Sequence, residues 1–266
     1  MRIICLNAWG GRLHAPLIAY LSNADPDVLC VQEVVHAPHA SAGWLTYRDD
    51  GQDLPQRANL FSEIAACLPD HVAQFCPAAR GDLWDGEAKV STLWGIATYM
   101  RRNLPIIAQS QGFVHGAFSP DGFGAHPRSR NAHAVRLFDH RRGGAVTIAH
   151  MHGLRDPQGK TDTPDRMAQT RRLMHLMGHL ANPEDPLIVC GDFNVLPESA
   201  TFQMLAEFGL RELVVERGWA GTRSSHYAKP NRFADYMLVN QHIARPRFEV
   251  VRDPEVSDHC PLMLQI

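Results

Sequence analysis

Long apolar runs, internal repeats and an excess of positive charge are all missing from this sequence. No apolar segment approaches the roughly 20 residues of a membrane-spanning helix. No glycine- and serine-rich linker divides the 266 residues, so we expect one large domain over residues 1–266. The formal net charge of −2 disfavours a protein that grips duplex nucleic acid through many phosphates. A local basic face stays open, because five arginines lie close together in the chain: Arg128, Arg130, Arg136, Arg141 and Arg142.

Cysteine motifs are missing as well. The sequence has six cysteines but no C-x-x-C pair, which argues against zinc-knuckle and thioredoxin-type sites. Cys5, Cys30, Cys190 and Cys260 lie in apolar strand-like runs, where a reduced cysteine behaves as a small hydrophobe. The chain starts directly with a strand-like segment and shows no charged leader or apolar signal region. We therefore expect a cytoplasmic protein with free thiols.

Short apolar runs rich in β-branched residues recur along the chain and predict buried strands. Helical patterns separate some of them, at Leu60–Leu68, after the N-cap candidate Thr163, and at Phe202–Phe208. This mixture predicts an α/β or α+β fold. The irregular stretch from Gly112 to Asn131 is long enough to form a rim around a functional site. The predicted strands are Ile3–Leu6, Val28–Val31, Trp94–Tyr99, Ala145–Ala149, Leu187–Cys190, Tyr236–Val239 and Pro261–Ile266.

Polar side chains stand at the ends of several predicted strands. Asn7 and His150 each follow an apolar run directly, and the pair Gln32 and Glu33 follows another. Asp192 and Asn194 follow another, and they can grip one group together because side chains alternate along an extended segment. Polar groups at the mouths of buried strands are held rigidly and face a cleft, as a preorganised site requires.

Each position also has an ordinary structural explanation. A strand-end carboxylate such as Glu33 can be a Mg²⁺ ligand or simply a solvated group. The segment Gly191–Asn194 can equally form an Asx-type turn. Asp235, at the start of a strand, can orient an imidazole or cap its own backbone. His150 and His152 are two residues apart on one predicted strand and can coordinate zinc together, although no convincing third ligand follows them in the sequence.

Six short segments that contain these polar residues and the C-terminal pair Asp258 and His259 resemble motifs of the endonuclease/exonuclease/phosphatase superfamily. Any one segment is common by chance, but all six occur in the family's order and span nearly the whole chain. They are Leu6–Gly10, Asp27–Glu33, Ala149–His150, Gly191–Asn194, Asp235–Val239 and Ser257–Leu262. The resemblance implies a four-layer sandwich, in which two mixed β-sheets pack face to face between outer helices and the cleft lies at one edge of the sheets.

The resemblance also implies a metal site. Glu33, supported by Asn7 and Asp258, would hold Mg²⁺ or Mn²⁺. Asp192 and Asn194 would orient the attacking water or bind a second ion. Carboxylate and amide oxygens are the donors that such hard cations prefer.

For the acid–base groups, the resemblance implies that Asp235 pairs with His259 and that His150 contacts the scissile phosphate. One departure affects this histidine. Members related to deoxyribonuclease carry a carboxylate just before the strand at Trp94–Tyr99, where it orients the histidine, but this chain has Thr92 and Leu93 there. His152 can therefore share the work of His150. We also predict that His152, together with Arg128 and Arg130, contacts the substrate.

These residues suit phosphoester hydrolysis. A divalent cation neutralises phosphoryl charge, and a histidine paired with a carboxylate can accept a proton from water. We predict a Mg²⁺- or Mn²⁺-dependent hydrolase of a small or lipid-like phosphoester. The alternatives are a nuclease on the same fold, a zinc-type metallohydrolase built on His150 and His152, and a binding module that has kept the fold without catalysis.

Overall fold

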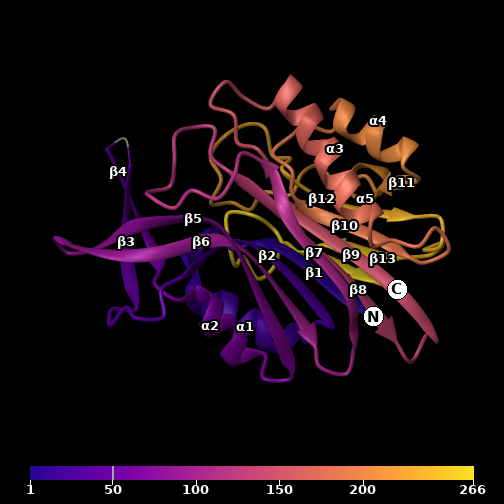
Figure 1. Cartoon of the computed structure of the whole chain (residues 1–266), viewed down its shortest axis with the longest axis horizontal. Helices are drawn as coiled ribbons and strands as arrows, with labels where there is room; N and C mark the ends of the chain where they lie inside the picture. The colour runs from indigo at the N-terminus through magenta and orange to yellow at the C-terminus, as the bar shows by residue number, and fades with distance from the viewer. Residues whose placement is uncertain (50) are drawn as a thin grey trace.

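Two β-sheets pack face to face in this computed structural model, which describes residues 1–49 and 51–266. Both sheets are mixed, and helices cover their outer faces (Figure 1). The first sheet has eight strands in the spatial order β13 (Arg247–Val250), β14 (Leu262–Gln265), β1 (Arg2–Asn7), β2 (Val28–His36), β6 (Ala88–Arg101), β5 (His71–Asp85), β3 (Trp44–Asp49) and β4 (Gln52–Arg57). The second has six, in the order β11 (Leu210–Glu212), β12 (Asp235–Asn240), β10 (Leu187–Asp192), β9 (Gly144–His152), β8 (Arg130–Asp139) and β7 (Ile106–His115).

The helices form the two outer layers. On the first sheet lie α1 (His14–Ala24) and α2 (Leu60–Cys67), and on the second lie α3 (Pro164–Gly178), α4 (Ala200–Glu207) and α5 (Leu213–Glu216) (Figure 1). A short 3-10 turn, Trp9–Gly11, follows β1. The four-layer sandwich and the mixed α and β content expected from the sequence are thus confirmed. Among the described residues, no helix combines the length and the apolar character that a membrane crossing needs.

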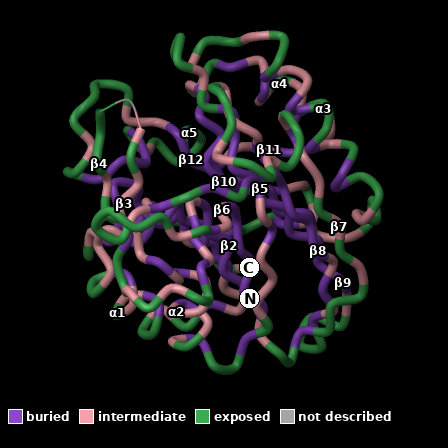
Figure 2. Tube along the Cα trace, turned by 60° about the vertical axis from the view of Figure 1, so that its left-hand side comes forward, coloured by how far each residue is buried: buried purple, intermediate pink, exposed green. Residues whose placement is uncertain are grey.

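Alternation along the central strands builds two apolar layers. In β1, Ile3 and Cys5 face the second sheet, while Ile4 and Leu6 face α1 and α2. Since both faces of such a strand are buried, its sequence reads as a continuous apolar run rather than an alternating one. Figure 2 shows the result, with buried strands in the centre and exposed loops around them.

Most predicted elements are confirmed, and each predicted strand lies in or overlaps one of the observed strands. Thr163 caps α3, because its side chain accepts a hydrogen bond from the Arg166 backbone nitrogen. The prediction of an irregular stretch from Gly112 to Asn131 is wrong at both ends. Gly112 belongs to β7 and Asn131 to β8, so the loop is confined to residues 116–129. It was misread because glycine and polar residues weaken the strand pattern at both ends.

Parallel pairing brings the carboxyl ends of β1, β9 and β10 next to the middle of β2. The expectation that Glu33 follows the end of a strand is wrong, because β2 continues past it to His36. β1 runs parallel to β2 in the first sheet, and β9 runs parallel to β10 in the second. The two sheets meet at β1 and β10, where the side-chain amide of Asn7 donates to the Asp192 carboxylate at 3.0 Å. The chain termini lie at the other end of these strands, where the Met1 ammonium donates to the Ile266 carbonyl at 2.7 Å. The strand ends opposite the termini therefore form the edge at which polar side chains gather.

Candidate active site

A bulge in β2 turns Glu33 out of the strand ladder. The pairing of β2 with β6 shifts register between Val31 and Val34, and Glu33 has φ +56°. A non-glycine residue in this left-handed region costs about 1–3 kcal/mol, and such strain concentrates at functional sites. The Glu33 carboxylate lies 3.9 Å from Nε2 of His152, which comes from the other sheet. Burial and the nearby Asp192 raise the pKa of Glu33.

Asp192 lies at the centre of the cluster, at the end of β10. One carboxylate oxygen accepts from Asn7 at 3.0 Å and lies 3.8 Å from Nε2 of both His152 and His259. The other oxygen accepts from the Asn194 backbone nitrogen at 3.0 Å. This is the Asx-type turn that the sequence left open. Asn194 has φ +55°, so the segment is not extended there, and its amide nitrogen points toward the Gly153 carbonyl at 3.4 Å. That Asp192 and Asn194 act together on one group stays a prediction.

Asp235 and His259 form a buried pair. Nδ1 of His259 lies 2.8 and 2.9 Å from the two carboxylate oxygens of Asp235, and the Thr222 hydroxyl donates to the same carboxylate at 2.9 Å. Burial raises the pKa of Asp235 to about 6. Burial, and then the charge of Arg223, lower the pKa of His259 to about 4. A neutral His259 held through Nδ1 presents Nε2 to the cluster, where it can accept a proton.

Arg223 was not predicted, and it is central to the electrostatics of the site. This buried guanidinium donates to Asp258 at 2.7 Å and stacks on the ring of Tyr227 at 4.3 Å. A backbone bridge pairs it with His259. Its segment is an irregular loop without a motif, so Arg223 could not be picked out from the sequence. Lys160, whose pKa burial lowers, is a second cation near these carboxylates that the sequence did not reveal.

The two histidines of β9 have different surroundings. His150 lies between the sheets, where Gln32 donates to its Nδ1 at 3.1 Å and Thr98 lies 2.8 Å from its Nε2. His152, one alternation further along the strand, lies in the cluster and packs against Trp94 at 5.4 Å.

The expected contact of His150 with a scissile phosphate is therefore corrected, because both of its ring nitrogens are engaged away from the edge. The same contacts argue against a zinc clamp made by His150 and His152. His152 takes the site position, and its buried Nδ1 has no hydrogen-bond partner among the described residues. This matches the missing carboxylate noted in the sequence.

Comparison with known proteins identifies the family and the fold of the chain. The model of the Endonuclease/Exonuclease/phosphatase family matches residues 4–259. The chain belongs to this family. A comparison with curated protein sequences found no match.

Solved structures show the same fold at low sequence identity. A mannosyl-6-phosphatase from Bacteroides thetaiotaomicron superposes with a TM-score of 0.64 at 15% identity, covering 100% of this chain and 98% of that one. The human Nocturnin catalytic domain with bound sulfate gives 0.64 at 18% identity, with 99% and 93% covered. D. rerio TDP2 complexed with a single-strand DNA product gives 0.62 at 15% identity, with 99% and 97% covered.

Divalent cations generally serve members of the endonuclease/exonuclease/phosphatase family, and the residues here fit one. Glu33, Asn7 and Asp192 offer oxygen donors from both sheets, and Asp258 faces the same cluster. One oxygen of Asp258 is buried without a hydrogen-bond partner among the described residues. An unpartnered buried carboxylate oxygen is costly unless a cation or donor satisfies it.

A second acidic group overlaps this set. Asp192, Asp235 and His259 place one potential ligand atom each within 4.8 Å of one another. However, Asp235 already uses its oxygens on His259 and Thr222. We therefore regard this group as the acid–base pair beside Asp192, and Glu33 with Asn7 and Asp258 as the better candidate for the cation.

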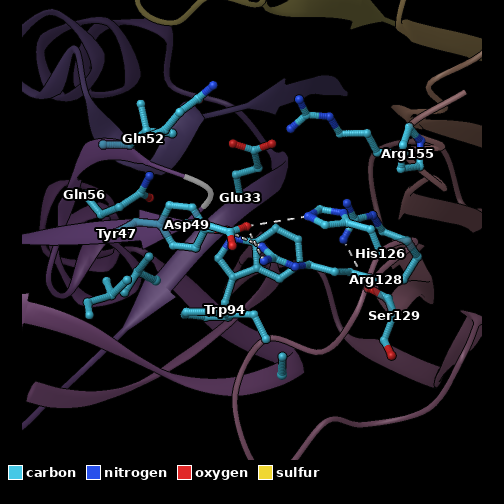
Figure 3. A pocket seen from close by; sticks show the side chains of 17 residues that line it. Glu33, Tyr47, Asp49, Gln52, Gln56, Trp94, His126, Arg128, Ser129 and Arg155 are labelled. Carbon is cyan, nitrogen blue, oxygen red and sulfur yellow. Dashed lines mark hydrogen bonds and ion pairs between the residues drawn. The ribbon is translucent and has the colours of Figure 1, made fainter. Parts of the chain in front are cut away.

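The two arginines predicted to contact substrate both line a cavity beside Glu33 (Figure 3). Arg130 is buried, donates to the Gly153 carbonyl at 2.9 Å and stacks over Trp94 at 5.1 Å. Burial lowers its pKa to about 10. Arg128 instead donates to Asp49 at 2.7 Å, which neutralises much of its charge.

The local basic face that the sequence left open does not form. Arg130 is buried at the site end of β8, whereas Arg141 and Arg142 lie in the turn beyond the other end of that strand. Arg136, between them, pairs with Asp185.

Proposed function

We propose that this protein is a Mg²⁺- or Mn²⁺-dependent hydrolase of phosphoesters. One observation carries the proposal: a neutral, carboxylate-held imidazole faces an oxygen-rich acidic cluster in a family of phosphoester hydrolases. His259 lies 3.8 Å from Asp192, which in turn connects to Asn7 and lies across His152 from Glu33. The proposed cation ligands and the proton acceptor His259 are thus neighbours in one cluster of side chains.

Proton transfer falls to His259 and Asp235. With its pKa at about 4, His259 is neutral near pH 7, and its Nε2 can take the proton of a water molecule as that water attacks phosphorus. Asp235, 2.8 Å from Nδ1, then stabilises the imidazolium that forms. Thr222 fixes the carboxylate by donating to it at 2.9 Å. The pair acts as one unit because each member is positioned by the other.

We assign the binding of the phosphoryl group to the other residues of the cluster. A divalent cation held by Glu33, Asn7 and Asp258 would supply charge neutralisation and Lewis acidity when bound. His152 presents Nε2 beside Glu33 and Asp192, where it can donate to a phosphoryl oxygen. Arg223 places a fixed positive charge against Asp258 at 2.7 Å, which limits the excess of negative charge in the pocket.

An activity screen tests the proposal. Plasmid DNA, abasic duplex, sphingomyelin, inositol phosphates and bis-p-nitrophenyl phosphate should be offered with Mg²⁺, with Mn²⁺ and with chelator. The matched variants are Glu33→Gln and Glu87→Gln, the second being an exposed carboxylate far from the cluster.

We expect cation-stimulated hydrolysis of at least one small phosphoester, lost in Glu33→Gln and kept in Glu87→Gln. Cleavage confined to the nucleic acids would favour the nuclease alternative. Absence of cation-stimulated hydrolysis, or equal activity of the two variants, would contradict the proposal.

A further inference from the structure

A cavity of about 350 Å³ lies beside Glu33, at the edge of the proposed cation site (Figure 3). The hairpin of β3 and β4 forms one wall, and the loop of residues 116–129 forms another. Arg128 joins these two walls by donating to the Tyr47 hydroxyl at 2.6 Å and to Asp49 at 2.7 Å. These hydrogen bonds hold the walls of the cavity together. Because Glu33 lines the cavity, an organic group attached to a phosphate at the proposed cation site can enter it.

Aromatic rings line its interior. Trp94 contacts both the Arg130 guanidinium and the His152 ring. Tyr47 and Phe123 meet edge to face at 5.5 Å on another side. Phe123 fits only because residue 81 is glycine, since a Cβ there would lie 2.7 Å from the phenyl ring. Three aromatic residues around one small space favour a flat, apolar ligand.

Charge is distributed unevenly along the cavity. In the interior, Arg128 is offset by Asp49, and the amides of Gln52 and Gln56 line the wall without net charge. At the end nearest Glu33 lie Arg130 and Arg155, and neither has an ion-pair partner within the described part of the chain. The cavity thus suits a ligand with an anionic head at the Glu33 end and a neutral flat body inside.

We propose that this cavity binds the organic group of the phosphoester, and that this group carries a planar aromatic ring, single or fused. The inference rests on the proposed function, because it places the phosphate at the neighbouring cluster. The volume is at the small end of ordinary ligand pockets, about 300–1,000 Å³, which suits one compact group rather than a duplex. The amides of Gln52 and Gln56 can bond polar atoms on the edge of such a ring.

A pair of matched substrates tests the inference. We compare 2-naphthylmethyl phosphate with butyl phosphate, each also as its methyl diester, because both release primary alcohols and differ mainly in the flat ring. The variants are Phe123→Ala, Phe123→Leu and the control Phe118→Ala, whose phenyl group is 41% exposed on the same loop and does not line the cavity. Binding of 2-naphthylmethylphosphonate, measured by calorimetry, gives a readout that needs no turnover.

Phe123→Ala should lower kcat/KM for the naphthylmethyl ester and weaken phosphonate binding by about 10-fold, with a smaller loss for Phe123→Leu. The butyl ester should change less than about twofold, and Phe118→Ala should change neither substrate. Equal losses on both esters with unchanged phosphonate binding would overturn the cavity assignment and leave the hydrolase proposal standing. If Phe123→Ala weakens phosphonate binding but the protein hydrolyses none of the esters, the result would support the cavity as the binding site of the aromatic group and overturn the hydrolase proposal.

Discussion

The pair of His259 and Asp235 makes the most specific prediction about the chemistry. If His259 accepts the proton and Asp235 acts only through it, the two substitutions should not add. We consider His259→Ala, Asp235→Asn and the double variant. Asparagine keeps the shape of aspartate and can still accept from Nδ1 of His259, but it removes the negative charge that lies 2.8 Å away.

The expected losses follow from these contacts. Removing a general base costs about 10²–10⁴-fold in kcat, so His259→Ala should lose that much. A hydrogen bond to a charged group contributes about 1.5–3 kcal/mol and a neutral one about 0.5–1.5 kcal/mol. Asp235→Asn should therefore forfeit about 1–2 kcal/mol of imidazolium stabilisation, or about 5- to 30-fold in kcat. Once the imidazole is gone, the charge at position 235 has nothing to stabilise, so the double variant should lose as much kcat as His259→Ala alone.

Single-turnover rates with saturating Mg²⁺ measure the chemical step directly, and near-ultraviolet circular dichroism checks that each variant is folded. Losses that multiply in the double variant would refute the reasoning, because they would mean that Asp235 acts independently of His259. An unchanged rate in His259→Ala would refute it as well.

Three further predictions concern neighbouring residues. His152→Gln should lower kcat at least about 10-fold with little change in Tm, whereas His150→Gln should mainly lower Tm, because it disturbs two buried hydrogen bonds that each contribute about 0.5–1.5 kcal/mol. Arg223→Gln should tighten Mn²⁺ binding and lower kcat, since it removes a cation bonded to Asp258 at 2.7 Å. Burial lowers the pKa of His133 from 6.5 to about 4, so the unfolded chain binds more protons in this window. The free energy of unfolding should therefore fall by about 3 kcal/mol from this group as pH drops from 6.5 to 4, and His133→Asn should flatten the dependence.

Each of these has a clear contrary result. Equal kinetic losses at positions 150 and 152 would place both histidines in the chemistry. Weaker Mn²⁺ binding in Arg223→Gln would mean that the arginine organises the cation site rather than opposing it. A pH dependence of unfolding that is the same in His133→Asn and the parent protein would assign acid sensitivity to other groups.

Buried strands made much of the edge predictable. Asn7, Glu33 and Asp192 each follow an apolar run, and such runs are recognisable because both faces of the strand are covered. Their convergence followed from the family resemblance, and the parallel pairs explain it physically. The Glu33 bulge was not predictable, because a register shift depends on the partner strand.

The choice between two histidines shows where sequence reasoning stops. His150 and His152 are two residues apart, which is about 6.6 Å along a strand, and both side chains point to the same face. Their roles differ only because of where the sheet ends: His150 lies inside and bonds Gln32 and Thr98, whereas His152 lies at the edge beside Glu33. Arg223 escaped prediction for a related reason, because a single arginine in an irregular loop carries no periodic signal.

The cavity depends on long-range contacts as well. Phe123 enters it from a loop, and its place is set by Gly81 on β5, about 40 residues earlier. No local pattern links these two positions. The hairpin of β3 and β4 forms a wall although its sequence lacks a continuous apolar run, so it was not among the predicted strands.

The central claim is that Glu33, with Asn7 and Asp258, holds a divalent cation beside His259. Titration of Mn²⁺ followed by electron paramagnetic resonance measures this binding without any substrate. The account predicts that Glu33→Gln binds Mn²⁺ roughly 10-fold more weakly or worse, while Glu87→Gln and His259→Ala bind like the parent protein. Superimposable titrations of Glu33→Gln and the parent protein would contradict it.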